Sequence, residues 1–184
     1  LPCIAPSMQS GVGIIFSAAV VGMFRFTTGI VPLDLVVLGT LDIEMAASIG
    51  AAINLIVDQR IDGVMERTQG RPLPTGGLSE AKAITFALTL GVVSMLMLIF
   101  MVNILTAFLT FISLIGYAVI YTMFLKRSTP QNIVLGGAAG ATPPLLGWAA
   151  ITGEVNSEAL LLFMIIFIWT PPHFWALAIR RREE

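Results

Sequence analysis

Charged residues are scarce in this chain of 184 residues, and their scarcity excludes an ordinary soluble domain. Asp, Glu, Lys and Arg make up 11% of the sequence and apolar residues 57%, with a mean hydropathy of +0.92. Because soluble domains carry about 25% charged residues, the composition indicates a membrane protein. The net charge of −1 gives no attraction for a polyanion, so we expect no nucleic-acid partner.

Cysteine and N-terminal basic residues are also nearly absent. The single cysteine, Cys3, excludes a disulfide framework within the chain and a cysteine-based metal site. No Lys or Arg precedes the first apolar segment, so the start of the chain lacks the basic region of a signal peptide. The first residue is Leu1 rather than Met, which we interpret as the mark of a fragment.

Long apolar runs predict an all-α fold, a polytopic transmembrane helix bundle. Each run approaches or exceeds the about 20 residues that cross a hydrocarbon core, and lipid offers no partner to unpaired backbone groups, which favours helices. The gap at Asn103 is tight, so the third and fourth spans should form a close antiparallel hairpin. The predicted spans are residues 12–26, 33–57, 81–102, 104–125, 133–151 and 159–179.

The basic residues predict the orientation of these spans. All of them except Arg25 follow the second, fourth or sixth apolar segment, and the connections after the third and fifth contain none. By the positive-inside tendency, the basic connections and both termini lie on the cytoplasmic or matrix side. We therefore expect a multi-pass integral protein of the bacterial cell membrane or the mitochondrial inner membrane, surrounded by the lipid bilayer.

Two acidic residues, Asp42 and Glu44, interrupt the second apolar segment. Charged residues within a span are costly and often functional. The apolar run restarts after them, however, so we favour a structural interpretation in which the helix begins near Met45.

A polar ladder ends the second segment. Asn54, Asp58 and Asp62 are four residues apart, and on a helix each step of four rotates only about 40° from alignment, which places all three on one face. Carboxylates one turn apart repel unless a cation lies between them or a proton neutralises one. Mg²⁺ prefers oxygen ligands and commonly shares them with substrate phosphates.

Two arginines follow this ladder. Arg67 and Arg71 lie in a stretch broken by glycine and proline, so they can fold back over the ladder. A guanidinium group can bind two phosphate oxygens at once. Acids, an amide and arginines at the end of a span together predict a Mg²⁺–diphosphate site at the membrane boundary. The alternative is a solvated loop with helix-end charges, which an isolated Asp pair would favour.

Three stretches in the same order resemble the UbiA-type intramembrane prenyltransferases, and among them the haem O synthase (protohaem IX farnesyltransferase) family. The first is the ladder with MERTQGRP at 65–72, and the second is YTMFLKRSTPQNIVLGGAAGATPPLLGWAAITG at 121–153. The third is WTPPHFWALAI at 169–179, whose PPHFWALA segment distinguishes this family from the quinone-pathway and chlorophyll-pathway enzymes. The resemblance covers about residues 46–179.

The resemblance implies an enzyme that transfers the farnesyl group of farnesyl diphosphate to a vinyl group of haem B. The product is haem O, the precursor of haem A, which makes haem A synthase an implied partner. Mg²⁺ is the expected cofactor, and haem B is a substrate rather than a cofactor.

The family fold is one domain of nine transmembrane helices around a central cavity, of which about six are visible here. The family's second acidic motif would begin just after Glu184, and its Lys-Pro entry before the first helix is missing. We therefore expect residues 1–184 to be a single domain, truncated at its C-terminus and atypical at its N-terminus, that is inactive alone.

The resemblance also assigns roles to individual residues. As catalytic residues, Asp58 and Asp62 would hold Mg²⁺ against the diphosphate, supported by Asn54. Other basic side chains would neutralise the charge that grows on the leaving diphosphate. This diphosphate-binding set is Arg67, Arg71, Lys126 and Arg127, and the alternative for the last two is a positive-inside anchor.

His173 is the only histidine and lies within a predicted span. The resemblance implies that it approaches the haem, as an axial ligand or a propionate partner, whereas a buried, hydrogen-bonded histidine is the ordinary alternative. The small-residue run GGAAGATPP at 136–144 should serve close helix packing, although it also leaves room for a flat macrocycle.

Two other functions stay open at this point. One is a UbiA-type prenyltransferase with an aromatic quinone-precursor or chlorophyll-type acceptor, which the PPHFWALA segment with His173 disfavours. The other is a non-enzymatic membrane carrier that uses Asp58 and Asp62 as an ion path. That function predicts isolated carboxylates without a nearby arginine pair.

Overall fold

The computed structural model describes residues 5–24, 31–64, 68, 70–125 and 132–180, and the regular secondary structure of these residues is entirely helical. Each predicted span overlaps one helix or two consecutive helical segments, so the all-α prediction is confirmed. The α-helices are α1 (Ala5–Phe24), α2 (Leu33–Asp62), α3 (Glu80–Met97), α4 (Ile104–Ile115), α6 (Asn132–Thr152) and α7 (Ser157–Arg180). Two π-helical segments, η1 (Leu98–Val102) and η2 (Gly116–Leu125), continue α3 and α4.

Among the described residues, four segments are long and apolar enough to cross a membrane. They are Leu33–Gln59, Glu80–Val102, Ile104–Thr122 and Ser157–Ala176, with mean hydropathies between 1.6 and 2.4. The protein is therefore an integral membrane protein.

α6 is the fifth predicted span, and it carries glycine, threonine and proline along its length. It packs against α1, α2, α4, η2 and α7, and every residue from 143 to 150 is buried. A helix that is surrounded by protein does not need a lipid-like surface, so its polar and small residues are compatible with a central position.

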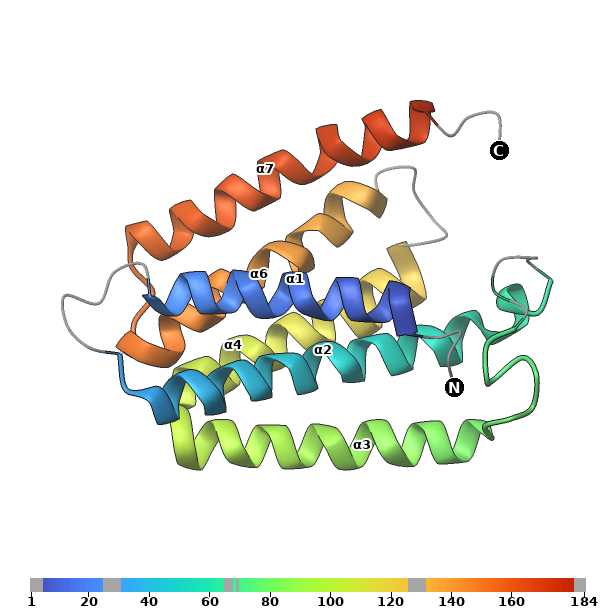
Figure 1. Ribbon diagram of the computed structural model, residues 1–184, viewed down its shortest axis with the longest axis horizontal. Helices are drawn as coiled ribbons and strands as arrows, with labels where there is room; N and C mark the ends of the chain where they lie inside the picture. Colours follow the sequence, from blue (N-terminus) through green and yellow to red (C-terminus); the bar gives the residue numbers. More distant parts are fainter. Residues whose placement is uncertain (1–4, 25–30, 65–67, 69, 126–131, 181–184) are drawn as a thin grey trace.

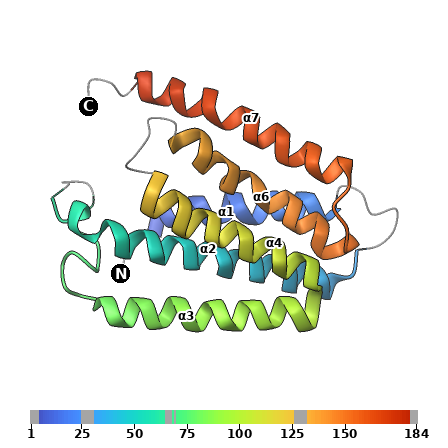
Figure 2. The ribbon, with the colours of Figure 1, turned by 180° about the vertical axis from the view of Figure 1, so that it is seen from behind.

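The helices lie side by side in a bundle (Figure 1). α3, which packs on α2, and α7, which packs on α6, form opposite edges of the bundle in both views (Figures 1 and 2). Between them α1, α2 and α6 share a buried apolar core. Its members are Ala19, Met23, Ile43, Leu146 and Ala150.

The third and fourth spans are joined by the expected tight hairpin turn at Asn103, but their α-helices do not pack closely on each other: α3 packs on α2, and α4 packs on α6 and α2. The Asn103 side chain accepts a hydrogen bond from the backbone N–H of Thr106 at 2.8 Å, which caps α4. The same side chain donates to the carbonyl oxygens of Ala149 at 2.9 Å and Ala150 at 3.2 Å. One polar residue therefore starts α4 and joins the hairpin to the end of α6.

The prediction that the second helix begins near Met45 is wrong. α2 starts at Leu33, directly after Pro32, and runs through Asp42 and Glu44 without a break. A break inside the bilayer would leave backbone N–H and C=O groups without partners, and each of these costs several kcal/mol. Asp42 is instead buried at 0% exposure within the helix, and its carboxylate oxygens have no hydrogen-bond partner in the described part of the chain.

The alternating direction of the helices brings the ends of α2, η2 and α7 to the same end of the bundle (Figure 1). We call this the ladder end, because α2 ends there with Asp58 and Asp62. α3 begins at the same end, with Lys82 in its first turn. The acidic ladder, Lys82 and the C-terminal ends of η2 and α7 therefore lie at one end of the bundle.

Candidate active site

The last two turns of α2 place Asn54, Asp58 and Asp62 as the spacing predicts. Because the helix continues unbroken to Asp62, the three side chains occupy one face. Both carboxylates are buried, with 7% of Asp58 and 5% of Asp62 exposed. Charged groups are seldom buried to this extent unless they are paired or bind a cation, so the ladder does not behave as a solvated loop.

The segment after α2 folds back over the ladder. Arg71 Nη1 donates to Asp62 Oδ2 at 2.6 Å, which is the length of a strong charge-assisted hydrogen bond. The buried Thr68 hydroxyl donates to the backbone carbonyl of Asp62 at 3.1 Å, and the N–H of Arg71 donates to the carbonyl of Thr68 at 3.0 Å. The predicted return of Arg71 is therefore observed.

Tight turns after Arg71 hold it in this position. The N–H and the hydroxyl of Thr75 both donate to the Arg71 carbonyl, at 3.1 and 2.9 Å. Gly76 adopts a φ of +75°, which glycine accepts without steric cost. Leu73, buried at 5% exposure, anchors this turn to the bundle. The guanidinium group is thus carried by a compact turn rather than by an extended connection.

A cavity of about 400 Å³ lies among α1, α2, α4, η2 and α6. It includes Gly50, which precedes Asn54 by four residues and so extends the ladder face by one turn. Hydroxyl groups supply the few polar positions, and Ser113 and Thr142 hydrogen-bond each other at 3.1 Å. The remaining lining is mostly aliphatic or small, and suits an apolar ligand whose polar end reaches the ladder.

The small-residue run in α6 serves the close helix packing expected of it, and part of the run also borders the cavity. A Cβ at Gly136 would lie 2.7 Å from Tyr121 Cε2, and one at Gly137 would lie 2.9 Å from Thr170 Cγ2. Close packing against η2 and α7 therefore requires glycine at these positions. Gly136 and Gly140 also line the cavity, and nothing lies within 4 Å of a Cβ at Gly140.

A second cavity, of about 310 Å³, lies between α2, the Arg71 turn and α3. Arg71, Leu73 and Phe86 are among its lining residues, and Ser48 borders both cavities. Arg71 therefore stands between the acidic ladder and a second apolar space.

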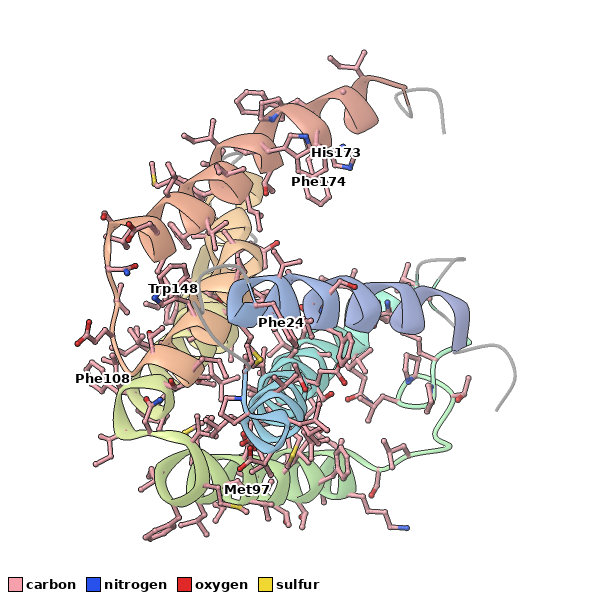
Figure 3. The ribbon with its side chains drawn as sticks, turned by 60° about the vertical axis from the view of Figure 1, so that its left-hand side comes forward. Phe24, Met97, Phe108, Trp148, His173 and Phe174 are labelled. Atoms are coloured by element: carbon pink, nitrogen blue, oxygen red, sulfur yellow. The ribbon has the colours of Figure 1, made fainter. Side chains whose placement is uncertain are left out.

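Among the described residues, His173 is a predicted site residue that is not brought to the ladder. His173 lies exposed on α7, stacked on Trp169 with ring centroids 4.3 Å apart and edge-on to Phe174 at 5.7 Å (Figure 3). It lines neither of the two cavities described above. Arg67, Lys126 and Arg127 lie outside the described residues.

The donor set of the ladder fits Mg²⁺. Two carboxylates and one amide oxygen are hard ligands, and Mg²⁺ usually keeps several waters while sharing one or two carboxylates with substrate phosphates. The described residues contain no group of three or more His, Cys, Asp and Glu side chains that could enclose a metal by themselves. The ladder would accordingly supply part of a coordination shell that phosphate oxygens and water complete.

Sequence reasoning missed the aromatic pair beside this site. Tyr117 and Tyr121 stack with centroids 5.4 Å apart and an interplanar angle of 19°. Tyr117 lines the cavity next to Gly50, whereas its position in an apolar span suggested no role. Two features of the sequence could have indicated this pair. Two tyrosines lie four residues apart in GYAVIY at 116–121, and Gly50 lies four residues before Asn54, on the same face of the helix.

An all-helical membrane bundle that carries a carboxylate ladder beside an apolar cavity has the architecture of the intramembrane prenyltransferases. The chain belongs to the UbiA prenyltransferase family, whose model matches residues 15–184.

Its similar relatives include proteins named protoheme IX farnesyltransferase. The chain is 60% identical over 173 residues to the protein of Nitrosococcus oceani, covering 94% of this chain and 58% of the relative. It is 58% identical over 173 residues to the protein of Methylococcus capsulatus, with the same coverage of each chain. The chain therefore spans less than two thirds of the length of these relatives.

Two solved structures share the fold. A UbiA homolog from Aeropyrum pernix K1 superimposes with a TM-score of 0.68 at 22% identity, over 87% of this chain and 58% of the other. A UbiA homolog from Archaeoglobus fulgidus, bound to DMAPP and Mg²⁺, superimposes with a TM-score of 0.67 at 18% identity, over 89% and 59%.

Proposed function

We propose that this chain carries the prenyl-diphosphate site of a protohaem IX farnesyltransferase, which joins the farnesyl group of farnesyl diphosphate to a vinyl group of haem B to give haem O. The observation that carries the proposal is the pair of buried carboxylates, Asp58 and Asp62, of which Asp62 is paired with Arg71, beside an apolar cavity. The name of relatives about 60% identical to this chain supports haem B as the acceptor.

The ladder residues would bind the polar end of the substrate. Asp58 and Asp62, supported by Asn54, would hold Mg²⁺, which screens the negative charge that grows on the leaving diphosphate. The archaeal homolog bound to DMAPP and Mg²⁺ supports this choice of metal. Arg71 is placed to contact a diphosphate at the ladder, and we assign the same role to Arg67, Lys126 and Arg127.

The reaction that follows from this arrangement is an ionisation and a capture. The bond between the allylic carbon and the diphosphate oxygen breaks, and its electron pair leaves with diphosphate. The vinyl group then attacks the allylic cation, and water adds to the resulting haem-side cation with loss of a proton. The apolar cavity would exclude other water from the first cation and hold the farnesyl chain.

Fewer of the described residues bear on how the acceptor is bound. We propose His173 as a haem contact on α7, with the bundle in the bacterial cell membrane and its ladder end on the cytoplasmic side. Haem A synthase would consume the product.

The test is product analysis in a host that lacks haem O synthase. The complete open reading frame that contains this chain is expressed there, and the extracted haems are separated and identified by mass spectrometry. We expect haem O, and we expect Asp58→Asn to abolish it while membrane insertion is kept.

Asp34→Asn is the matched control for this experiment. It makes the same chemical change in the same helix, at an exposed position in the first turn, far from the ladder end. If the host makes a prenylated quinone precursor and no haem O, the acceptor is a quinone precursor rather than haem B. Normal haem O from Asp58→Asn would remove the ladder from the mechanism.

A further inference from the structure

We propose that the ring of Tyr117 stabilises the allylic carbocation that forms when the prenyl diphosphate ionises. This would make Tyr117 a catalytic residue that contacts neither metal nor diphosphate. The inference rests on the proposed prenyl transfer, but it does not depend on which acceptor captures the cation.

The position of Tyr117 relative to the ladder is the first support. The ring approaches Gly50, which is one helical turn from Asn54 and two turns from Asp58 on the same face of α2. A diphosphate bound at the ladder would therefore direct its allylic carbon into the cavity at the level of this ring.

The orientation of the ring is the second support. A Cβ at Gly50 would lie 3.0 Å from Tyr117 Cδ1 and 3.2 Å from Cε1, and the next atom, at 3.9 Å, belongs to Leu114. Gly50 therefore meets one edge of the ring. One face stacks on Tyr121, whose own edge is fixed against Gly136. The Tyr117 ring is thus fixed by Gly50 at one edge and by Tyr121 on one face, and Tyr117 lines the cavity.

The chemistry of the surroundings is the third support. Tyr117 is the only aromatic residue among the described residues that line this cavity; the others are aliphatic, small or hydroxyl-bearing. A cation within about 6 Å of an aromatic centroid is attracted by the ring quadrupole, most strongly where water is excluded. The ring forms no bond and moves no proton: the electron pair leaves with diphosphate, and the acceptor supplies the new carbon–carbon bond.

A ring that only fills space would look similar in a structure, so the test varies electrostatics at constant shape. Tyr117→Phe in the complete open reading frame is the reference. Mono-, di- and trifluorophenylalanine then replace that phenylalanine in turn, because fluorine weakens cation binding stepwise with little change of ring size. Each variant is assayed for kcat and KM with farnesyl diphosphate and haem B in membranes.

We expect log kcat to fall linearly with the number of fluorines, by about 10- to 100-fold over the series, with KM for farnesyl diphosphate little changed. The same fluorinated series at Phe108, which is 58% exposed on α4 and lines neither of the two cavities, should leave kcat unchanged. A flat series at residue 117, or a Tyr117→Leu variant with the kcat of the wild type, would overturn the proposal.

The failure of this proposal is distinguishable from that of the proposed function. If the wild type prenylates another acceptor, the haem assignment fails, and the same series measured on that product still tests Tyr117. If the wild type makes haem O but the series is flat, only the role of Tyr117 is refuted. If the wild type transfers no prenyl group, both are refuted.

Discussion

Gly147→Ala should destabilise the bundle although alanine is a better helix former than glycine. A Cβ at Gly147 would lie inside van der Waals contact with the Ala19 carbonyl oxygen, 3.0 Å from its carbonyl carbon and 3.2 Å from its Cα. All three are backbone atoms of α1, so no side-chain rotation can relieve the contact. The two helices would have to move apart along an interface where Gly22 approaches the Pro144 carbonyl in the same way.

The magnitude follows from two opposing effects. Replacing glycine by alanine inside a helix gains about 1 kcal/mol of helix propensity, whereas forcing an extra methyl group into a packed interface costs about 1–3 kcal/mol, occasionally more. Because the contact is with backbone atoms, we place the packing cost at about 2–3 kcal/mol and expect a net loss of about 1–2 kcal/mol in the free energy of unfolding. Helix association in membranes depends on such close packing, since lipid chains compete for apolar contacts.

Gly140→Ala is the matched control in the same helix. Nothing lies within 4 Å of a Cβ at Gly140, so this variant should keep the propensity gain without the packing loss. The free energy of unfolding of both variants is measured by SDS titration in mixed micelles, where the propensity effect cancels in their difference. The reasoning is refuted if Gly147→Ala is as stable as Gly140→Ala.

Three further variants test other parts of the structure in the same SDS titration. Arg71→Ala should lower the free energy of unfolding by about 1–2 kcal/mol, because it leaves the buried Asp62 carboxylate without its ion pair, although the 38% exposure of Arg71 permits screening by water. The same variant should raise KM for farnesyl diphosphate, and an unchanged KM would show that Arg71 does not bind the substrate. Asp42→Val should stabilise the protein by about 1–3 kcal/mol, since the fully buried carboxylate has no hydrogen-bond partner in the described part of the chain. A loss of stability would show that the carboxylate has a favourable contact. Asn103→Ala should lower the free energy of unfolding more than Asn156→Ala does. Both side chains cap a helix, but only Asn103 also donates hydrogen bonds to carbonyl groups of α6. Equal losses would exclude a role for the contact with α6.

The helices and the ladder were predictable because they depend on local pattern. Runs of apolar residues can satisfy their backbone groups in lipid only as helices, and each predicted span became helical. A spacing of four places Asn54, Asp58 and Asp62 on one face of any helix. The same local reasoning failed at Asp42, where the charge of one side chain suggested a helix boundary. Because unpaired backbone groups are costly within the bilayer, α2 continues through Asp42 in spite of that charge.

The contacts across the bundle were not predictable from pattern. The arginines after α2 were expected to fold back, but which carboxylate would be paired depended on the turn that follows Arg71. The central position of α6 was likewise not predictable, because its apolar run marked it only as another span, whereas every residue from 143 to 150 is buried and the helix packs on several others.

By itself, the sequence determined that this is an all-helical membrane protein with an acidic ladder at one end, because helix formation in lipid and the helical repeat act over a few residues at a time. Only the tertiary structure decided what the ladder faces. Gly50 continues the ladder face from α2, and Tyr117 meets it from η2, more than sixty residues later in the chain. That meeting depends on the close packing of helices at glycines, a property of two surfaces together that neither segment shows alone.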